Sequence, residues 1–232
     1  MEQPIKKNDV LEVTIADLTY EGMGVAKIDH FPIFIENALP EEVVAIKVVK
    51  VLKKFAFGIV TEFIKKSPYR VEADKKMLQT GIAPLQHLAY DQQLLFKKEQ
   101  VKNVLSKIAK MPEVPVEDTL GMAQPFGYRN KVSIPIRQIE GQLTPGFFRK
   151  NSHNFIPMTD VFIQDPAINE ALEKIVAILN QFGVKGYNEE KHHGFMRHII
   201  IRRGHYTKQM MIVFVTNKAK FFQGEEIAKK VA

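Results

Sequence analysis

The segment Gly127-Tyr128-Arg129-Asn130-Lys131 runs directly into the alternating stretch Val132-Ser133-Ile134-Pro135-Ile136-Arg137. Alternation of apolar and polar residues predicts a strand with one buried face. The first segment places two cations, a carboxamide and a phenol ring at the start of that strand. Arg and Lys bind phosphate, Arg and Asn read base edges, and a Tyr ring stacks on bases. The pattern fits an RNA contact, and it equally fits a solvated turn that enters a strand.

The sequence around this stretch predicts an antiparallel α+β domain. Residues 132–137 and 143–149 form one expected hairpin, and residues 197–203 and 209–216 form a second. Residues 155–163 are a further strand candidate.

A helix is expected between the two hairpins. Asp165 and Pro166 have the residue types of an N-cap and a first helical position, and Gly183 marks the end. The apolar face of this helix consists of Ile168, Leu172, Ile175, Val176 and Leu179.

The first part of the chain is different, because residues 8–62 contain about five short β-branched runs separated by glycine and proline turns. That pattern predicts a small barrel or sandwich. Gly22-Met23-Gly24 does not open a helix, so it predicts a hairpin turn and not a phosphate loop. Residues 91–110 predict an amphipathic helix ended by Pro112, and its apolar face includes Leu94, Val101, Leu105 and Ile108.

Composition narrows the function classes. The 232 residues contain no cysteine, which excludes disulfides, Cys-ligated metals and a cysteine nucleophile within this sequence. No apolar run resembles a membrane span or a signal peptide, so we expect a cytoplasmic protein. Residues 1–62 hold 7 Lys/Arg and 10 Asp/Glu, whereas the remainder holds 26 and 16. The basic excess after residue 62 favours a polyanionic partner over ordinary solubility charge.

Two further segments combine aromatic, basic and amide side chains, namely residues 147–155 and residues 197–203. Such mixtures suit base stacking with phosphate contact, although we expect at least one of Phe147 and Phe148 to point into the core. His192, His193 and His198 lack an acidic or Cys partner at convincing ligand spacing, so we expect no metal site.

Taken together, these segments resemble the 5-methyluridine RNA methyltransferases, with bacterial 23S ribosomal RNA uracil-5 methyltransferases as the nearest subgroup. Residues 22–26 and 38–43 resemble the family's N-terminal TRAM domain, an OB-like barrel. Residues 84–88 resemble the linker, and residues 127–131 and 146–150 resemble motifs of the central domain. Ser152, His153, Ile163, Gln164, Arg197, His198 and Arg202 extend the match.

The resemblance implies three parts: a TRAM domain over 1–63, a linker with an amphipathic helix over 64–116, and a central α+β RNA-recognition domain over 117–232. It implies S-adenosylmethionine as cofactor of the full-length enzyme, and RNA, most closely 23S rRNA, as partner. The family's Rossmann-like catalytic domain, with its donor site and catalytic Cys, is expected beyond residue 232. The apolar face of the helix over 91–110 is then expected to be either exposed or buried by self-association.

This sequence departs from the resemblance at the four cysteines with which many family members bind a [4Fe–4S] cluster. The matching positions are Asp74, Thr80, Ala83 and Val161. We therefore expect no iron–sulfur cluster, with apolar packing by Ile82, Ala83 and Val161 in its place.

The family reaction needs a thiolate that adds to uracil C6, a base that removes the C5 proton, and a flipped uracil. We therefore expect this chain to bind RNA without methylating it. Ribosome-assembly modules without catalysis, transfer-RNA methyltransferases and RNA-independent protein-interaction domains remain alternatives. The residues expected to contact RNA are Tyr128, Arg129, Asn130, Lys131, Arg149, Lys150, His153, Arg197 and His198.

Overall fold

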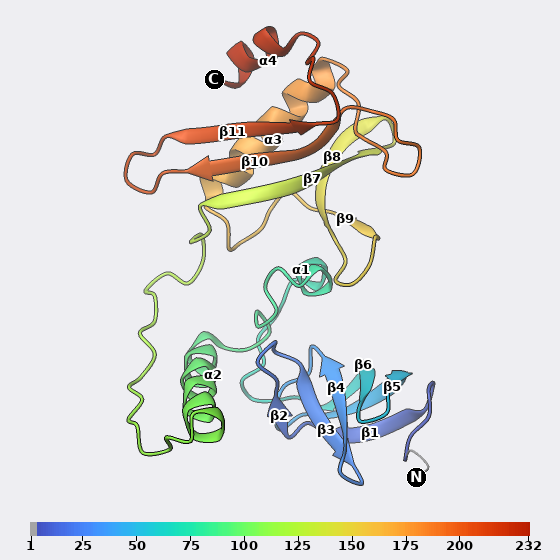
Figure 1. Cartoon of the computed structure of the whole chain (residues 1–232), viewed down its shortest axis with the longest axis vertical. Helices are drawn as coiled ribbons and strands as arrows, with labels where there is room; N and C mark the ends of the chain where they lie inside the picture. The colour runs from blue at the N-terminus through green and yellow to red at the C-terminus, as the bar shows by residue number, and fades with distance from the viewer. Residues whose placement is uncertain (1–3) are drawn as a thin grey trace. The chain divides into compact units, whose positions relative to one another are not determined.

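The computed structural model describes residues 4–232, which fall into two compact units (Figure 1). Unit 1 comprises the chain up to Leu78 together with Ile82–Gly121. Unit 2 comprises Gln79–Gly81 and Met122–Ala232. None of the helices formed by residues 4–232 combines the length and the apolar character that crossing a bilayer requires.

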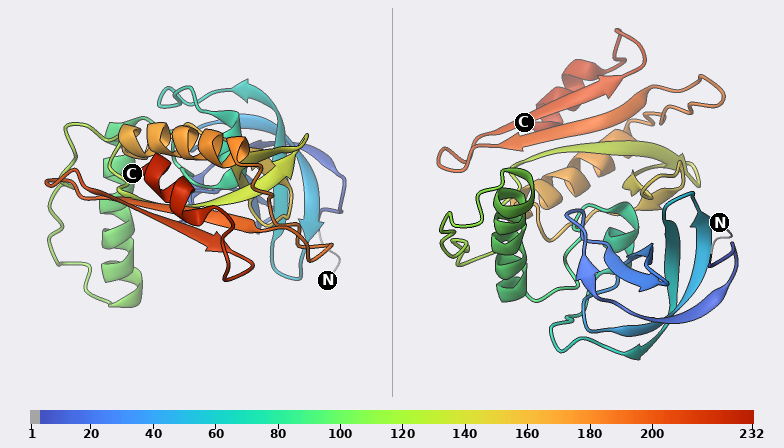
Figure 2. Two further views of the ribbon diagram at one scale, coloured as in Figure 1. Left: turned by 90° about the horizontal axis from the view of Figure 1, so that it is seen from above. Right: turned by 60° about the horizontal axis from the view of Figure 1, so that its bottom comes forward.

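Unit 1 is built on a six-stranded sheet with the order β1-β5-β6-β4-β3-β2, which curls around an apolar core (Figure 2). Its strands are β1 (Val10–Thr14), β2 (Asp17–Leu18), β3 (Gly24–Ile28), β4 (Phe31–Glu36), β5 (Val43–Val51) and β6 (Ala56–Lys65). The β-rich prediction is confirmed, with β2 as an additional short strand. Gly22 lies in the turn that joins β2 to the antiparallel β3, so the predicted hairpin is also confirmed.

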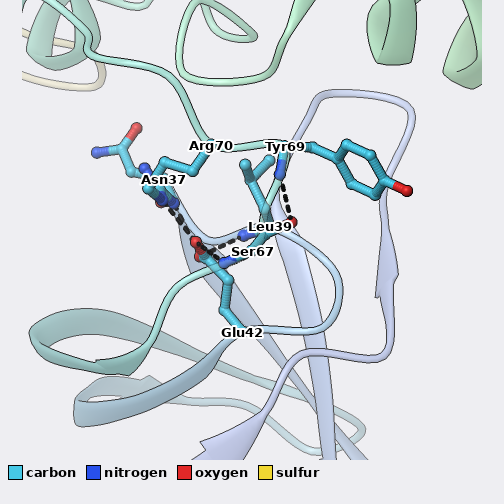
Figure 3. A network of polar contacts seen from close by, with 6 residues as sticks. All are labelled: Asn37, Leu39, Glu42, Ser67, Tyr69 and Arg70. Carbon is cyan, nitrogen blue, oxygen red and sulfur yellow. Dashed lines mark hydrogen bonds and ion pairs between the residues drawn. The ribbon is translucent and has the colours of Figure 1, made fainter.

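A buried ion pair ties the segment that leaves the sheet back onto unit 1. Glu42 is fully buried, and its carboxylate accepts hydrogen bonds from Arg70 at 2.5 and 2.8 Å (Figure 3). The backbone N–H groups of Leu39 and Ser67 donate to the same carboxylate, and Arg70 also donates to the Asn37 carbonyl oxygen. Burial raises the pKa of Glu42, but the Arg70 and backbone hydrogen bonds outweigh it and lower the pKa overall.

Replacing one member of the Glu42–Arg70 pair is expected to lower the stability of unit 1 more than replacing both. Glu42→Gln leaves the Arg70 guanidinium buried without a counter-ion and should destabilise unit 1 by about 3 kcal/mol. The double variant Glu42→Gln/Arg70→Met should lose clearly less, because no uncompensated charge remains. Urea unfolding followed by circular dichroism measures both, and an equal loss in the two variants would contradict a buried charge pair.

His87 lies beside this pair, and it is fully buried. Neither of its ring nitrogens has a hydrogen-bond partner among the described residues. The pKa of His87 is lowered to about 4, mainly because burial disfavours the charged ring; the Arg70 charge contributes to the lowering, and Glu42 opposes it. The folded chain therefore holds His87 neutral at a pH where an exposed histidine would begin to take up a proton.

This neutral histidine makes stability depend on pH. The unfolded chain binds a proton near the ordinary His pKa of 6.5, whereas folded His87 binds it only near 4. Stability is therefore complete above about pH 6.5 and falls by about 2 to 3 kcal/mol on acidification to pH 4.5. Glu42 adds little over most of this window, because its lowered pKa begins to cost stability only as the pH falls toward the ordinary Glu pKa of 4.5.

The measurement that isolates His87 is amide hydrogen exchange of the β4 and β6 backbone between pH 7 and 4.5, corrected for intrinsic rates. His87→Leu should keep a nearly constant opening free energy over this range. A parent chain whose opening free energy is equally flat would refute the assignment.

The helices of unit 1 are α1 (Lys75–Thr80), whose last two residues belong to unit 2, α2 (Tyr90–Asn103) and a π-helical turn, η1 (Val104–Ile108). The short α1 was missed because residues 67–84 have no clear period. The helix predicted over 91–110 exists: it leaves α geometry at Val104, continues as η1 to Ile108, and is followed by Lys110 with φ of 59°. None of its side chains is fully buried, and Val101 and Ile108 are exposed.

Unit 2 is a five-stranded antiparallel sheet with the order β11-β10-β7-β8-β9, covered on one face by helices. Its elements are β7 (Lys131–Ile139), β8 (Gln142–Phe148), β9 (Phe155–Pro157), α3 (Pro166–Gln181), β10 (Met196–Arg203), β11 (Met210–Thr216) and α4 (Gly224–Val231). Both predicted hairpins are confirmed. The Asp165 side chain accepts from the Ala167 N–H, which confirms the predicted N-cap.

The five apolar residues predicted for α3 are all buried against the inner face of the sheet, and Ile227 of α4 joins the same core. The strand predicted over 155–163 is wrong beyond Pro157. Pro157 has no backbone N–H to continue the ladder. The following chain turns at Val161 and then pairs with the segment before β7.

Candidate nucleic-acid interface

The sheet of unit 2 has one buried and one open face. Ile134 and Ile136 of β7 and Ile199 and Ile201 of β10 are fully buried under α3. Successive side chains of a strand point to opposite faces, so their neighbours point outward. The outward residues of the three strands β7, β10 and β11 are Lys131, Ser133, Pro135, Arg137, His198, Ile200, Arg202, Met211, Val213 and Val215.

The segment before β7 is held by backbone hydrogen bonds to the chain that precedes α3. Gly127 has φ of 64° and donates to the Phe162 carbonyl oxygen. The Arg129 N–H donates to the Ile163 oxygen, and the Arg129 carbonyl accepts from the Asp165 N–H. Arg203 donates its own N–H to the Asn130 carbonyl oxygen. The backbone of residues 127–131 is therefore fixed from both sides.

The side chains of this fixed segment are available to a partner. Tyr128 is 51% exposed, Asn130 and Lys131 are exposed, and Arg129 is half-buried. The guanidinium of Arg129 and the ammonium of Lys131 form no ion pair with any described residue. Arg203 differs, since Asp165 accepts from its guanidinium at 2.5 Å. Asp165 thus serves both as helix cap and as counter-ion.

Lys131 and Arg202 are directly opposite each other in the register of β7 and β10, and both are exposed. Like charges in opposite positions of an antiparallel pair destabilise the sheet. No described acidic side chain forms an ion pair with either of them. A shallow depression lined by Arg202, Thr207, Gln209 and Met211 adjoins this pair. We call Arg129, Lys131 and Arg202 the basic cluster; its arrangement suits a phosphate group.

The other end of the open face carries a second cluster, about 20 Å along β7 at the usual strand rise. Glu189 lies between Arg137 at 3.0 Å and Arg197 at 3.9 Å. The Arg137 guanidinium lies 5.2 Å from the Phe148 ring centroid, and that of Arg197 lies 4.9 Å from the centroid of Tyr187. Both guanidinium groups are therefore oriented by an aromatic ring and by one carboxylate.

The pKa values of Glu189 and His198 in this second cluster are both lowered. The Arg137 hydrogen bond lowers the pKa of Glu189, with further lowering by Arg197 and His153. Burial lowers the pKa of His198, and the charges of Arg197 and Arg137 add to this effect. Glu189 is thus ionised and His198 neutral at pH 7, so the cluster carries a net positive charge from its two arginines.

The predicted contact residues do not form one group. Arg129 and Lys131 lie in the basic cluster, whereas Arg197, His198 and His153 lie around Glu189. Arg149 and Lys150 are exposed in the turn between β8 and β9, and no described acidic side chain pairs with them. The Lys150 N–H donates to the Gln79 carbonyl oxygen, which fixes that turn onto the short α1 segment of unit 2.

Sequence reasoning missed Arg137 and gave Arg202 only a minor place. Along its strand, each of these arginines alternates with buried isoleucines, so its side chain points to the open face. This alternation is the sequence signal by which both residues could have been found. Of the two neighbouring phenylalanines, Phe147 packs against the core and Phe148 contacts Phe155 on the other face, as expected for one inward and one outward ring.

The residues at the positions that match cluster cysteines do not fit an iron–sulfur cluster. Asp74 caps α1 by accepting from the Met77 N–H at 2.8 Å. Val161 is fully buried, and Ala83 is half-buried. Residues 4–232 hold no group of three or more His, Cys, Asp or Glu side chains placed to bind a metal. Within that range the His192 ring contacts the Tyr187 hydroxyl at 3.2 Å.

Charge separates the two units sharply. Unit 2 holds 16 Lys and Arg against 9 Asp and Glu, a net charge of +7, whereas unit 1 holds 17 of each and is neutral. Of the net charge of +10 after residue 62, +7 belongs to the unit that carries the open sheet face and +3 to unit 1.

Comparison with known proteins gives a TRAM domain over residues 4–61. A protein named "Uncharacterized RNA methyltransferase" from Enterococcus faecalis is 52% identical over 98% of this chain. A protein of the same name from Lactiplantibacillus plantarum is 48% identical over the same share. Both alignments cover 50% of the relative, so this chain spans about half the length of the curated relatives it matches.

A solved structure has the same fold. It is the Pyrococcus abyssi tRNA (uracil-54, C5)-methyltransferase in complex with S-adenosyl-L-homocysteine, with a TM-score of 0.69 and 23% identity. The match covers 93% of this chain and 48% of that one. The fold of each unit is thus a known one, and the chain is similar along nearly its whole length to proteins named RNA methyltransferases.

The described residues offer no site that fits S-adenosylmethionine. Such cofactors bind where a parallel strand leads through a glycine loop into a helix. Among the described strands only β4 and β6 run parallel, and β5 rather than a helix lies between them in the chain.

Proposed function

We propose that this chain, as a relative of these RNA methyltransferases, is the RNA-binding part of an S-adenosylmethionine-dependent RNA (uracil-5-)-methyltransferase. The observation that carries the proposal is the basic cluster of unit 2. Arg129, Lys131 and Arg202 stand on a rigid backbone without acidic partners, within a unit of net charge +7. An RNA phosphate is the anion that a relative of RNA methyltransferases is expected to meet there.

In this proposal the residues have separate tasks. Arg129, Lys131 and Arg202 neutralise phosphate, while Asn130 reads a base edge or orients the loop, and Tyr128 stacks. Arg149, Lys150 and His153 extend the contact across the β8–β9 turn. Arg197 and His198 belong to the second cluster, where Glu189 orders the guanidinium groups.

The chemistry of methyl transfer is proposed for the longer protein. The named activity of the structural relative is directed at uracil C5 of tRNA, and a uracil C5 is our proposed target here, in 23S rRNA. Addition to uracil C6 requires a thiolate, and these 232 residues contain no cysteine. We therefore propose that the units described here hold and position RNA, and that the nucleophile and the methyl donor lie on further polypeptide in the same protein.

Charge removal in the basic cluster should weaken RNA binding and its salt dependence together. The variant Arg129→Ala/Lys131→Ala should bind a ribosomal RNA hairpin at least about tenfold more weakly. The slope of log K against log salt should become shallower by about 1.4 to 1.8 for two lost phosphate contacts. Fluorescence anisotropy titrations over a series of salt concentrations measure both quantities.

A matched control removes the same charge from the opposite side of the sheet. Lys174 of α3 and Lys229 of α4 are exposed on the two helices that cover the inner face. Lys174→Ala/Lys229→Ala should leave affinity and slope close to those of the parent. Equal effects of the two double variants would show that net charge alone attracts RNA, and unchanged binding in the first would remove the site.

The division of labour has its own test. The purified chain, incubated with RNA and radiolabelled S-adenosylmethionine, should transfer no methyl group to a uracil, because it cannot form the thiolate adduct. Scintillation counting of the recovered RNA provides the measurement, with an active uracil-5 methyltransferase as positive control. Methyl incorporation by this chain alone would contradict the proposal, and RNA binding without incorporation supports it.

A further inference from the structure

Unit 1 has an aromatic cluster that the RNA-contact prediction did not include. Phe34, Phe55 and Phe57 contact one another in a closed triangle, with ring centroids 5.4, 5.9 and 5.5 Å apart. All three are half-buried, and none packs against the apolar core of the unit, in contrast to Phe31 and Phe63. We call these three residues the phenylalanine triad.

The strand register explains why the triad lies on the outer side of the sheet. Ile33 and Ile35 of β4 are fully buried, so Phe34 between them points away from the core. Phe34 pairs with Phe57 of the parallel strand β6. Phe55 follows from the tight turn between β5 and β6, where the Leu52 N–H donates to the Phe55 carbonyl oxygen.

Exposed lysines lie on the strands and the turn next to the triad. Lys50 is opposite Phe57 in the register of β5 and β6, and Lys53 and Lys54 form the turn immediately before Phe55. Lys27 and Lys47 are exposed on β3 and β5, so the lysine side chains of this surface are Lys27, Lys47, Lys50, Lys53 and Lys54. None of them forms an ion pair with a described acidic side chain. Glu36 of β4 is an acidic side chain that points to the same outer side of the sheet as Phe34.

We propose that the phenylalanine triad and its lysines form a second binding site, which takes unpaired bases of single-stranded RNA. Phenyl rings outside the core offer stacking faces to any base, and a rim of unpaired ammonium groups matches a phosphate backbone. A duplex hides its base faces, so this chemistry selects unpaired nucleotides. Charge complementarity favours RNA over a protein partner, because most protein surfaces carry both signs.

This site adds to the proposed function without sharing its residues. The basic cluster lies on unit 2, and the triad lies on unit 1. Unit 1 is neutral overall, but five of its 17 cationic side chains are exposed lysines on β3, β5 and the β5–β6 turn, which flank the strands of the triad. The net charge of a domain therefore conceals a local basic surface, which here coincides with the aromatic rings.

Substitution of the rings without change of charge provides the test. The full chain carrying Phe34→Leu/Phe57→Leu should bind a fluorescein-labelled oligouridylate of about 10 nucleotides about tenfold or more weakly, with the salt slope unchanged. The difference in affinity between this oligonucleotide and a duplex of equal length should shrink. Phe222→Leu is the matched control, because Phe222 is 77% exposed on unit 2, and it should bind like the parent.

The lysines should respond in the opposite way. Lys53→Ala/Lys54→Ala should make the salt slope shallower by about 1.4 while the triad remains intact. Photo-crosslinking of a 5-bromouridine oligonucleotide to the parent chain, followed by mass spectrometry, should place adducts on peptides that contain Phe34, Phe55 or Phe57. This mapping requires no substitution, so it decides the question even where a variant loses its fold.

The outcomes separate this site from the proposed function. Parent-like binding by the ring variant, or adducts confined to unit 2, overturns the triad site and leaves the basic cluster standing. Parent-like binding by Arg129→Ala/Lys131→Ala, with adducts on the triad, removes the basic cluster alone. A parent chain that binds no RNA refutes both and would assign the triad surface to a protein partner.

Discussion

The two-residue period of the strands is the constraint on which both candidate surfaces depend. In unit 2, burial of Ile134, Ile136, Ile199 and Ile201 leaves the intervening residues no position except the open face. In unit 1, burial of Ile33 and Ile35 in the same way forces Phe34 outward. A slip of the register by one residue would bury the lysines and arginines and expose the core, so core packing holds the surface chemistry in place.

Composition alone misjudged unit 1. The first 62 residues are acidic by count, and the whole unit is neutral. Neither number describes the surface, because the Glu42 carboxylate is buried against Arg70, while the lysines around Phe55 have no described acidic partner. Where charges are paired internally, the net charge underestimates the local field that a polyanion experiences.

Local signals predicted local structure well. The Asp165-Pro166 cap, the apolar face of α3 and the two hairpins follow from the residue types within a few positions, and the structure confirms them. Elements whose geometry depends on distant partners were missed. The chain after Pro157 does not continue as a strand because Gly127 and Arg129 supply the hydrogen-bond partners of Phe162, Ile163 and Asp165, and this pairing is not visible within residues 155–163.

The same distinction holds for the site residues. Arg129 and Lys131 were identified from one short motif, but Arg202 joins Lys131 only through the pairing of β7 with β10. Arg137 and Glu189 are 52 residues apart in the sequence and meet through the loop before β10. The phenylalanine triad likewise needs the parallel pairing of β4 with β6. Period and composition predict each strand, and only the register shows which side chains share a surface.

The opposition of Lys131 and Arg202 has an energetic consequence. Two like charges across a strand pair disfavour the folded sheet, and no described acidic group offsets them. Nearby, Arg203 does have such a partner, since Asp165 neutralises it while capping α3. Asp165 therefore neutralises Arg203, whereas Lys131 and Arg202 on the open face have no acidic partner among the described residues. The repulsion slightly lowers the stability of the free protein. An anion that binds between Lys131 and Arg202 removes it, and this relief adds to the free energy of anion binding.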